Sequence, residues 1–251
     1  MTENMIPRGQ CRLCGARKPH TLVDLGESPL ANSFVQPENA AVPDGFYPLH
    51  AQVCGECLLV QVDDVVPASE IFSKEYAYFS SFSDSWLKHC KRYADSMIER
   101  FALDKSSLVI EIASNDGYLL QFFANAGVTI LGIEPAANVA AAAEAKGIPT
   151  RVAFFSHALA AAMRNEGLRP NLVCSANVLA HVPDIVDFAR GVATLMSGSS
   201  VYTVEFPHLL NMIEQVQFDT IYHEHYSYLS LIAVENLFSR VGLRVFDVEE
   251  I

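Results

Sequence analysis

The chain has 251 residues, of which 51% are hydrophobic, and a formal net charge of −12. This length accommodates one large domain, or a small domain beside a medium one. No segment of the sequence has the apolar length of a signal peptide or a membrane span, so we expect a cytoplasmic protein without a membrane partner. The excess of acidic over basic residues and the lack of a Lys/Arg cluster argue against a nucleic-acid partner.

Residues 1–67 are expected to form a small zinc-binding module. They contain two pairs, Cys11-x-x-Cys14 and Cys54-x-x-Cys57, which are separated by 39 residues. In a reducing compartment, two such pairs bring four thiolates around one tetrahedral zinc ion and leave no position open for substrate. Four free or disulfide-paired cysteines are the weaker alternative. The spacing therefore predicts a structural zinc ion bound by all four side chains.

From residue 68 onward, the sequence predicts an α/β domain that extends to residue 251. An amphipathic helix is expected over residues 86–101, and strand-like runs then alternate with helical periodicity. Such alternation is typical of a Rossmann-like parallel sheet with helices on both faces. The expected strands are 108–113, 129–134, 150–154, 171–176, 200–206 and 244–248, with shorter extended runs at 47–53 and 58–62 in the zinc module. The expected helices are 118–126, 137–146, 157–166, 185–196 and 233–241.

The turn after the first strand of this domain is the candidate cofactor loop. Its small and flexible residues are Ala113, Ser114, Asn115 and Gly117. At the carboxyl end of a parallel strand, such residues allow a ligand to approach the backbone closely. Glu134 ends the next strand, where a carboxylate can accept hydrogen bonds from a ribose diol. The sequence has neither a G-x-G-x-x-G fingerprint nor a P-loop, which favours S-adenosylmethionine over a cofactor bound through its phosphates.

The segment from Tyr222 to Tyr228 has the highest density of proton-handling side chains in the chain. Two His, one Glu and three Tyr stand within seven residues, after the strand expected at 200–206. An imidazole with a pKa near 6.5 is well matched to general-base catalysis near neutral pH. In this segment Glu224 could bind a hydroxyl group, and Tyr222 could donate a hydrogen bond to an oxyanion.

Other interpretations of these histidines remain open. The metalloprotease motif His-Glu-x-x-His is excluded, because Ser227 occupies its last position. His223 and His225 could share a metal ion, since alternate residues of a strand lie on one face. A polar surface loop is a further alternative. His181, which follows the strand expected at 171–176, suits a packing role at a helix start as well as a catalytic one.

In combination, these motifs resemble the zinc-containing, S-adenosylmethionine-dependent C-methyltransferases that act on nucleotide-linked deoxy keto-sugars. The resemblance covers essentially the whole chain, and it implies a zinc module, a class I methyltransferase domain and a C-terminal domain. The segments that carry it are the two cysteine pairs, 76–86, 111–117, Glu134-Pro135, 177–183 and 222–225.

The resemblance also implies roles for single residues. The implied cofactor-binding residues are Ala113, Ser114, Asn115, Gly117, Glu134, Pro135 and Asn177. The implied catalytic residues are Tyr76, His181, Tyr222, Glu224 and His225. Within these sets, Glu134 binds the ribose, and His225 removes a proton next to a carbonyl group. The other catalytic residues bind the sugar and stabilise the enolate.

The chain departs from this family because it ends soon after the strand expected at 244–248, so we expect a fragment or a short relative. Three alternatives to sugar C-methylation remain. An NAD-dependent nucleotide-sugar epimerase is disfavoured, because the glycine fingerprint and a Tyr-x-x-x-Lys pair are both missing from the sequence. The others are methylation of another small molecule and a non-catalytic zinc protein that retains the fold.

Overall fold

The computed structural model describes residues 6–17, 19–32, 35, 37–63, 66–67 and 77–251. The chain folds into two compact units. The first, which we call the cysteine unit, comprises Met1–Ile71, Leu179–Val186 and Phe206–Ile251. The second, which we call the Rossmann unit, comprises Phe72–Val178 and Asp187–Glu205. Each unit has its own sheet and its own hydrophobic core.

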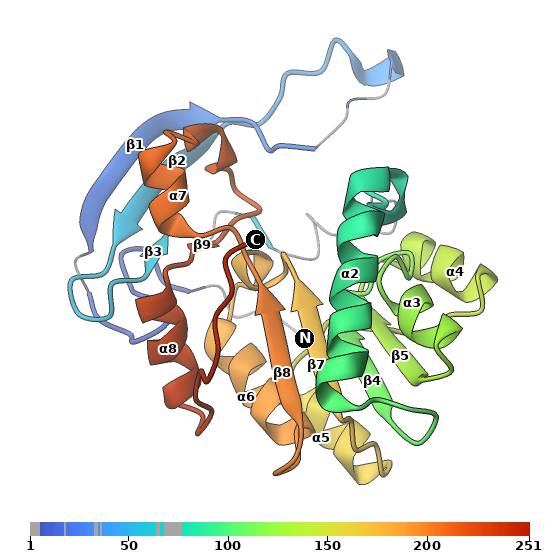
Figure 1. The fold of residues 1–251 in the computed structure, drawn as a ribbon. Helices are drawn as coiled ribbons and strands as arrows, with labels where there is room; N and C mark the ends of the chain where they lie inside the picture. Colours follow the sequence, from blue (N-terminus) through green and yellow to red (C-terminus); the bar gives the residue numbers. More distant parts are fainter. Residues whose placement is uncertain (1–5, 18, 33–34, 36, 64–65, 68–76) are drawn as a thin grey trace. The chain divides into compact units, whose positions relative to one another are not determined.

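The Rossmann unit is built on a five-stranded parallel sheet with the order β6-β5-β4-β7-β8 (Figure 1). The first strand, β4, lies in the centre, and the strand order reverses between β4 and β7. Because crossovers between parallel strands are right-handed, this reversal sends helices to both faces of the sheet. The strands are β4 (Leu108–Ile112), β5 (Thr129–Glu134), β6 (Thr150–Val152), β7 (Leu172–Ala176) and β8 (Val201–Glu205).

Helices connect these strands, and serine side chains cap two of them. Ser83 accepts a hydrogen bond from the backbone N–H of Trp86, and Ser156 accepts one from that of Leu159, so both helices begin where an N-cap residue stands. The helices are α2 (Asp84–Phe101), α3 (Leu120–Asn125), α4 (Ala137–Ala145), α5 (His157–Asn165) and α6 (Ile185–Leu195), with a 3-10 turn at Ser80–Phe82.

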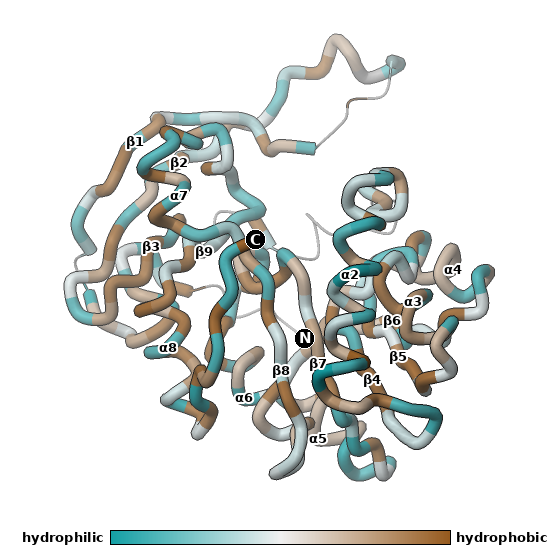
Figure 2. The backbone as a smooth tube through the Cα atoms, in the orientation of Figure 1, coloured by the Kyte–Doolittle hydropathy of each residue, from teal (hydrophilic) through white to brown (hydrophobic). Residues whose placement is uncertain are grey.

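The core of the Rossmann unit lies between the sheet and the helices α2 and α3. Ala94, Phe123 and Leu172 are fully buried there. Figure 2 shows that β4 and β5 are among the hydrophobic segments of this unit. Strands buried on both faces are continuous apolar runs, which is why the sequence predicts them clearly.

The cysteine unit contains a four-stranded antiparallel sheet with the order β1-β2-β3-β9. Its last strand, β9, belongs to the segment from Tyr222 to Tyr228, so the sheet joins that segment to the N-terminal part of the chain. The strands are β1 (His20–Ser28), β2 (Tyr47–Val53), β3 (Val60–Gln61) and β9 (Ser227–Tyr228). The helices are α7 (Leu209–Glu214) and α8 (Leu231–Ser239), with 3-10 turns at Pro37–Asn39, Leu179–His181 and Phe218–Thr220.

Most of the predicted elements are confirmed, and the strand expected at 244–248 is wrong. No strand forms in that stretch, and Phe246 and Val248 are 56% and 60% exposed. A strand exists only through a hydrogen-bond ladder with a neighbour, and the parallel ladder among the described residues ends at β8. Strand β1 and helix α7 were not predicted. The domain boundary at residue 67 stays a prediction.

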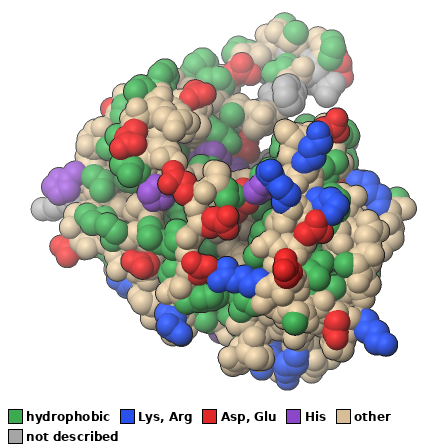
Figure 3. Space-filling model, viewed as in Figure 1, with side chains coloured by type: hydrophobic (Ala, Val, Ile, Leu, Met, Phe, Trp, Pro, Cys, Tyr) green, Lys and Arg blue, Asp and Glu red, His purple; other side chains and the backbone are tan. Residues whose placement is uncertain are grey.

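The surface of the described residues is rich in acidic groups. Asp and Glu side chains are spread over the face shown in Figure 3, in keeping with the net charge of −12. Every helix that the structure describes is too short or too polar to cross a membrane.

Candidate functional site

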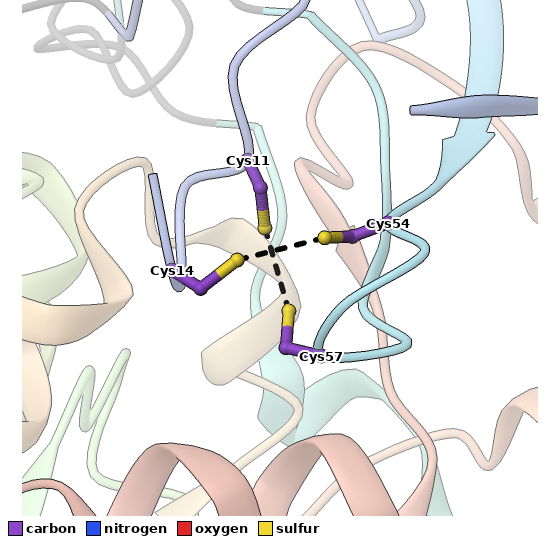
Figure 4. A group of neighbouring side chains, drawn as sticks. All are labelled: Cys11, Cys14, Cys54 and Cys57. Carbon is purple, nitrogen blue, oxygen red and sulfur yellow. Dashed lines mark hydrogen bonds between the residues drawn. The ribbon is translucent and has the colours of Figure 1, made fainter. Parts of the chain in front are cut away.

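The four cysteines of the two pairs point toward one another (Figure 4). The Sγ atoms of Cys11 and Cys57 are 3.5 Å apart, as are those of Cys14 and Cys54, and all four sulfur atoms lie within 4.8 Å of one another. Tetrahedral Zn–S bonds of about 2.3 Å place sulfur atoms roughly 3.8 Å apart. The cluster therefore has the size of a zinc site.

Two tight turns create this arrangement. The backbone N–H of Gly15 donates to the carbonyl of Cys11, and that of Leu58 donates to the carbonyl of Cys54. Strand β2 ends at Val53 and leads directly into the second turn. The thiol of Cys57 hydrogen-bonds to Cys11 and lowers the pKa of Cys11 to about 5. The same contact raises the pKa of Cys57, and burial raises that of Cys14. Thiolates are the form in which cysteine binds metal, so Cys11 is the member of the cluster that is already prepared for a cation.

His225 lies in a hydrogen-bond chain that fixes its tautomer. Its Nδ1 is 2.9 Å from the carbonyl oxygen of Thr220, and its Nε2 is 2.9 Å from the hydroxyl of Tyr222. A carbonyl oxygen can only accept, so Nδ1 carries the proton and Nε2 is the acceptor. Tyr222 consequently donates its hydroxyl proton to Nε2. The electron pair of this imidazole therefore lies on Nε2, where it accepts the hydrogen bond from Tyr222.

His181 contacts the same imidazole from another part of the chain. The ring centroids of His181 and His225 are 4.6 Å apart, and the rings are inclined by 69°. Burial lowers the pKa of His181 to about 3, and repulsion from a charged His225 adds to the shift. Burial also lowers the pKa of His225, while the Thr220 carbonyl opposes the shift. Both imidazoles are therefore neutral near pH 7, and a neutral imidazole can accept a proton.

Glu224 and His223, the residues that precede His225 in this segment, have different partners. Oε1 of Glu224, which is 4% exposed, accepts a hydrogen bond of 2.9 Å from Nδ2 of Asn32. Burial raises the pKa of Glu224. His223 is buried, and its Nε2 lies 3.3 Å from the carbonyl of Pro48. His223 and His225 thus have separate neighbours, and the geometry gives no support to a metal ion shared between them.

The candidate cofactor loop is held at the carboxyl edge of the Rossmann unit's sheet. Ala113, Asn115 and Gly117 have φ angles of 57°, 47° and 78°, so the loop turns through left-handed conformations. Glu134, at the end of β5, accepts from the backbone N–H of Asn115 at 3.0 Å and from that of Ala136 at 2.8 Å. Burial raises the pKa of Glu134, and these two N–H groups oppose the shift.

Side chains of the loop also bind the segment that precedes α2. Asn115 accepts from the backbone N–H of Ser80 at 2.9 Å and donates to the carbonyl of Tyr78 at 3.1 Å. Asp116 accepts a hydrogen bond from Ser81 and pairs with Lys146 at 2.9 Å. Residues 78–81, part of the segment 76–86 that carries the resemblance, are thereby held on the cofactor loop. Tyr76, the residue predicted from that segment, lies outside the described residues.

Gly117 is required at its position for two reasons. Its φ angle of 78° is left-handed, and a Cβ atom there would lie 2.8 Å from Cγ1 of Ile148. Only glycine avoids both the strain and the contact. Pro135 follows Glu134 at the start of the turn into α4, and Asn177 follows β7 with a φ angle of 57°.

Two residues near this sheet edge, Glu205 and His89, were not predicted from the sequence. Glu205 ends β8 and pairs with Nε2 of His89 at 2.8 Å, and its carbonyl accepts from the backbone N–H of Asn177. The signal was available, because Glu205, like Glu134, is an acid at the carboxyl end of a parallel strand. The predicted cofactor-binding residues lie in the Rossmann unit, and the described members of the catalytic set lie in the cysteine unit.

Comparison with known proteins decides the family. Residues 86–248 match the family described as "Methyltransferase domain", and residues 11–72 match the family described as "Putative zinc binding domain". The chain belongs to the methyltransferase domain family. It is 34% identical over 248 residues to C-methyltransferase NovU of Streptomyces niveus, and the match covers 99% of this chain and 59% of NovU. The chain thus spans about three-fifths of this curated relative.

Solved structures support the fold alone. A structure titled "putative sarcosine dimethylglycine methyltransferase", from Galdieria sulphuraria, is 15% identical with a TM-score of 0.50, and the match covers 64% of this chain and 63% of that one. The PH0226 protein of Pyrococcus horikoshii OT3 is 9% identical with a TM-score of 0.50, over 65% of this chain and 84% of that one. Both share the Rossmann-like arrangement.

The expected cofactors, S-adenosylmethionine and structural zinc, are those of the two matched domains. The sulfur spacing of the four cysteines fits zinc. In the cofactor loop, Oγ of Ser114 and Oδ1 of Asp116 are buried without a hydrogen-bond partner among the described residues. A ligand that carries hydrogen-bond donors, such as an ammonium group and ribose hydroxyls, would satisfy such oxygens. The assignment of each residue to a part of the cofactor stays a prediction.

The lowered pKa values of His181, His223 and His225 predict a dependence of stability on pH. The folded-state pKa of His181 lies below its unfolded value near 6.5, so the unfolded chain binds more protons at mildly acidic pH. The stabilising contribution is present above about pH 6.5 and is lost as the pH falls toward about 3, by up to about 1.4 kcal/mol per pH unit for one histidine. Urea unfolding at pH 7.0 and 5.5, with the zinc content checked at both, measures it. His181→Gln should reduce the dependence, whereas the exposed His157→Gln should not; equal slopes in both variants would contradict the assignment.

Proposed function

We propose that the protein transfers a methyl group from S-adenosylmethionine to a carbon next to a ketone in a nucleotide-linked deoxy keto-sugar. The observation that carries the proposal is the neutral imidazole of His225. Its Nε2 accepts a hydrogen bond from the Tyr222 hydroxyl, and its Nδ1 donates to the Thr220 carbonyl. A methyltransferase that acts on oxygen or nitrogen meets a nucleophile with its own electron pair. A carbon acceptor has none until a base removes a proton, so methylation of carbon requires a prepared base of this kind.

The proposed reaction begins with proton removal. His225 takes the α-proton of the sugar on Nε2, and the electrons of the broken C–H bond form an enolate with the neighbouring carbonyl. The Tyr222 hydroxyl, released from Nε2, donates a hydrogen bond to the enolate oxygen. Bound S-adenosylmethionine supplies an electrophilic methyl group on a sulfonium. His225 keeps the proton while the enolate carbon bonds to that methyl group, and S-adenosylhomocysteine leaves.

The remaining residues have binding roles in this proposal. Glu224 and His181 bind the sugar beside His225, with Tyr76 in the same role. In the Rossmann unit, the backbone of the loop and Glu134 bind the cofactor. Positioning of the two reactants supplies much of the rate, because it replaces a collision with a fixed geometry. The zinc ion holds the fold and takes no part in the reaction.

The substrate class can be tested with the protein expressed from its complete gene. A panel of nucleotide-linked deoxy keto-sugars is incubated with S-adenosylmethionine, and the sugars are examined by mass spectrometry. We expect the mass of one methyl group to be added to a member of the panel. Methylation of a compound without a nucleotide, and of no member of the panel, would contradict the proposed substrate class.

Replacing Glu134 tests the cofactor assignment. Glu134→Ala removes the acceptor proposed for the ribose and also the partner of two loop N–H groups, so cofactor affinity should fall by about 1–3 kcal/mol. Titration calorimetry with S-adenosylmethionine measures the change. Glu144→Ala, which alters an exposed acid on α4, is the matched control. Unchanged affinity in Glu134→Ala would show that the ribose binds elsewhere.

A further inference from the structure

Arg12 is a buried cation inside the first cysteine turn. It stands between Cys11 and Cys14, and it is only 5% exposed. Its guanidinium donates to the carbonyl of Pro183 at 2.7 Å and to the carbonyl of Val62 at 2.6 Å. Its Cζ lies 5.2 Å from the centre of the Tyr226 ring. One side chain of the first cysteine turn, which we call the metal turn, therefore contacts three other segments of the cysteine unit.

Two of these segments carry the histidines of the candidate site. Pro183 lies two residues after His181, and Tyr226 directly follows His225. The third segment is tied to the second of these, since the backbone N–H of Val62 donates to the carbonyl of Tyr226 at 3.1 Å. The backbone of the metal turn is tied in as well, because the N–H of Arg12 donates to the side chain of Gln61 in β3.

These contacts suit arginine and no other residue. A planar guanidinium presents several donors at fixed angles and can also stack on an aromatic ring, whereas a lysine ammonium is a single point of charge. Burying a cation is costly unless carbonyl groups surround it. An apolar side chain would fill the same space at lower cost in solvation. A buried charge at this position therefore points to control of position rather than to stability alone.

We propose that Arg12 is a positioning residue that couples the metal turn to the paired histidines, so that the segments it contacts hold His225 where Thr220 and Tyr222 fix its tautomer. This inference rests on the proposed function for its effect on turnover, although its structural part is independent of it. If Arg12 serves only packing, changing it should alter stability and leave the histidines of the folded protein unchanged.

Two variants, Arg12→Lys and Arg12→Ala, test the proposal in the full-length, zinc-loaded protein. The first readout is the tautomer of His225, observed through long-range nitrogen–proton NMR correlations. The wild type should show Nδ1 protonated and Nε2 as the acceptor. Both variants should keep zinc and S-adenosylmethionine affinity, yet show a mixture of tautomers. Arg151→Ala, which breaks a surface ion pair with Glu166, is the control and should match the wild type.

Turnover is the second readout, measured on the sugar that the protein methylates. Arg12→Lys should lower kcat by about 10–100-fold, the size of effect that a small misplacement of a reacting group produces. Millimolar guanidinium should partly restore kcat and the single tautomer to Arg12→Ala, which has space for it, and not to Arg12→Lys.

The outcomes separate the two proposals. If the wild-type protein methylates no sugar, the proposed function is wrong, and the NMR readout alone then decides the role of Arg12. A wild-type His225 signal in Arg12→Lys would overturn the positioning role. So would loss of zinc or of folding in both variants, because Arg12 would then be a folding residue.

Discussion

Replacing His225 by Asn should cut turnover by roughly 10²–10⁴-fold, the usual contribution of a positioned base. Asn retains a donor for the Thr220 carbonyl, but it has no basic nitrogen for the α-proton. S-adenosylmethionine affinity should not change, because the residues assigned to the cofactor belong to the Rossmann unit. Steady-state kinetics and calorimetry on the protein expressed from its complete gene measure both quantities. His50→Asn, which alters a histidine on β2, should retain turnover.

Loss of turnover alone would not identify the base, so proton removal must be measured separately. With an unreactive analogue of the methyl donor bound, the wild type should exchange the α-proton of the sugar with solvent deuterium. His225→Asn should slow this exchange along with methylation. If the variant exchanges at the full rate and yet fails to methylate, His225 positions the substrate. The base would then have to be sought among His181, Glu224 and Tyr76.

Replacing Cys57 by Ser should release the zinc ion and unfold much of the cysteine unit. Structural zinc supplies folding free energy directly, with apparent values of about 10–16 kcal/mol in zinc-finger peptides, so loss of one ligand should cost at least several kcal/mol. Elemental analysis and urea unfolding measure the two effects. Because β3 follows the second cysteine turn and pairs with β9, turnover should be lost as well.

Cys90 provides the matched control for this prediction. It is a buried residue of α2, in the core of the Rossmann unit, and it lies outside the metal cluster. Cys90→Ala should cost about 1 kcal/mol through lost packing and keep the full zinc content. Less than half a zinc ion per chain in wild-type protein that has never met a chelator would contradict the four-cysteine site.

The elements that could be predicted are those with a clear hydrophobic pattern in their own sequence. Strands β4, β5 and β7 are buried apolar runs, and their ends are marked by turn residues, so their positions follow from the sequence. Strand β1 is different because its residues are mostly exposed. It exists through its pairing with β2, which no local pattern encodes. The stretch 244–248 is the opposite case: it has a strand-like composition and forms no strand.

The candidate site divides in the same way. The spacing of the cysteine pairs predicts the cluster, because few other structures require that pattern. The density of side chains from Tyr222 to Tyr228 marks that segment without revealing the tautomer of His225. The contact of His181 with His225 depends on tertiary folding. Arg12 could not be predicted, because a single arginine between two cysteines has no pattern that distinguishes it from a surface residue.

The position of a labelled methyl group tests most directly whether the methyl group goes to a carbon next to a ketone. The protein expressed from its complete gene is incubated with S-adenosylmethionine labelled with carbon-13 in its methyl group and with nucleotide-linked keto-sugars deuterated beside the carbonyl. Carbon NMR then shows the atom to which the label is bonded. We expect a label bonded to carbon, with loss of the deuterium from that carbon. A label on oxygen or nitrogen, or transfer to a carbon that keeps its deuterium, would contradict the proposed enolate chemistry.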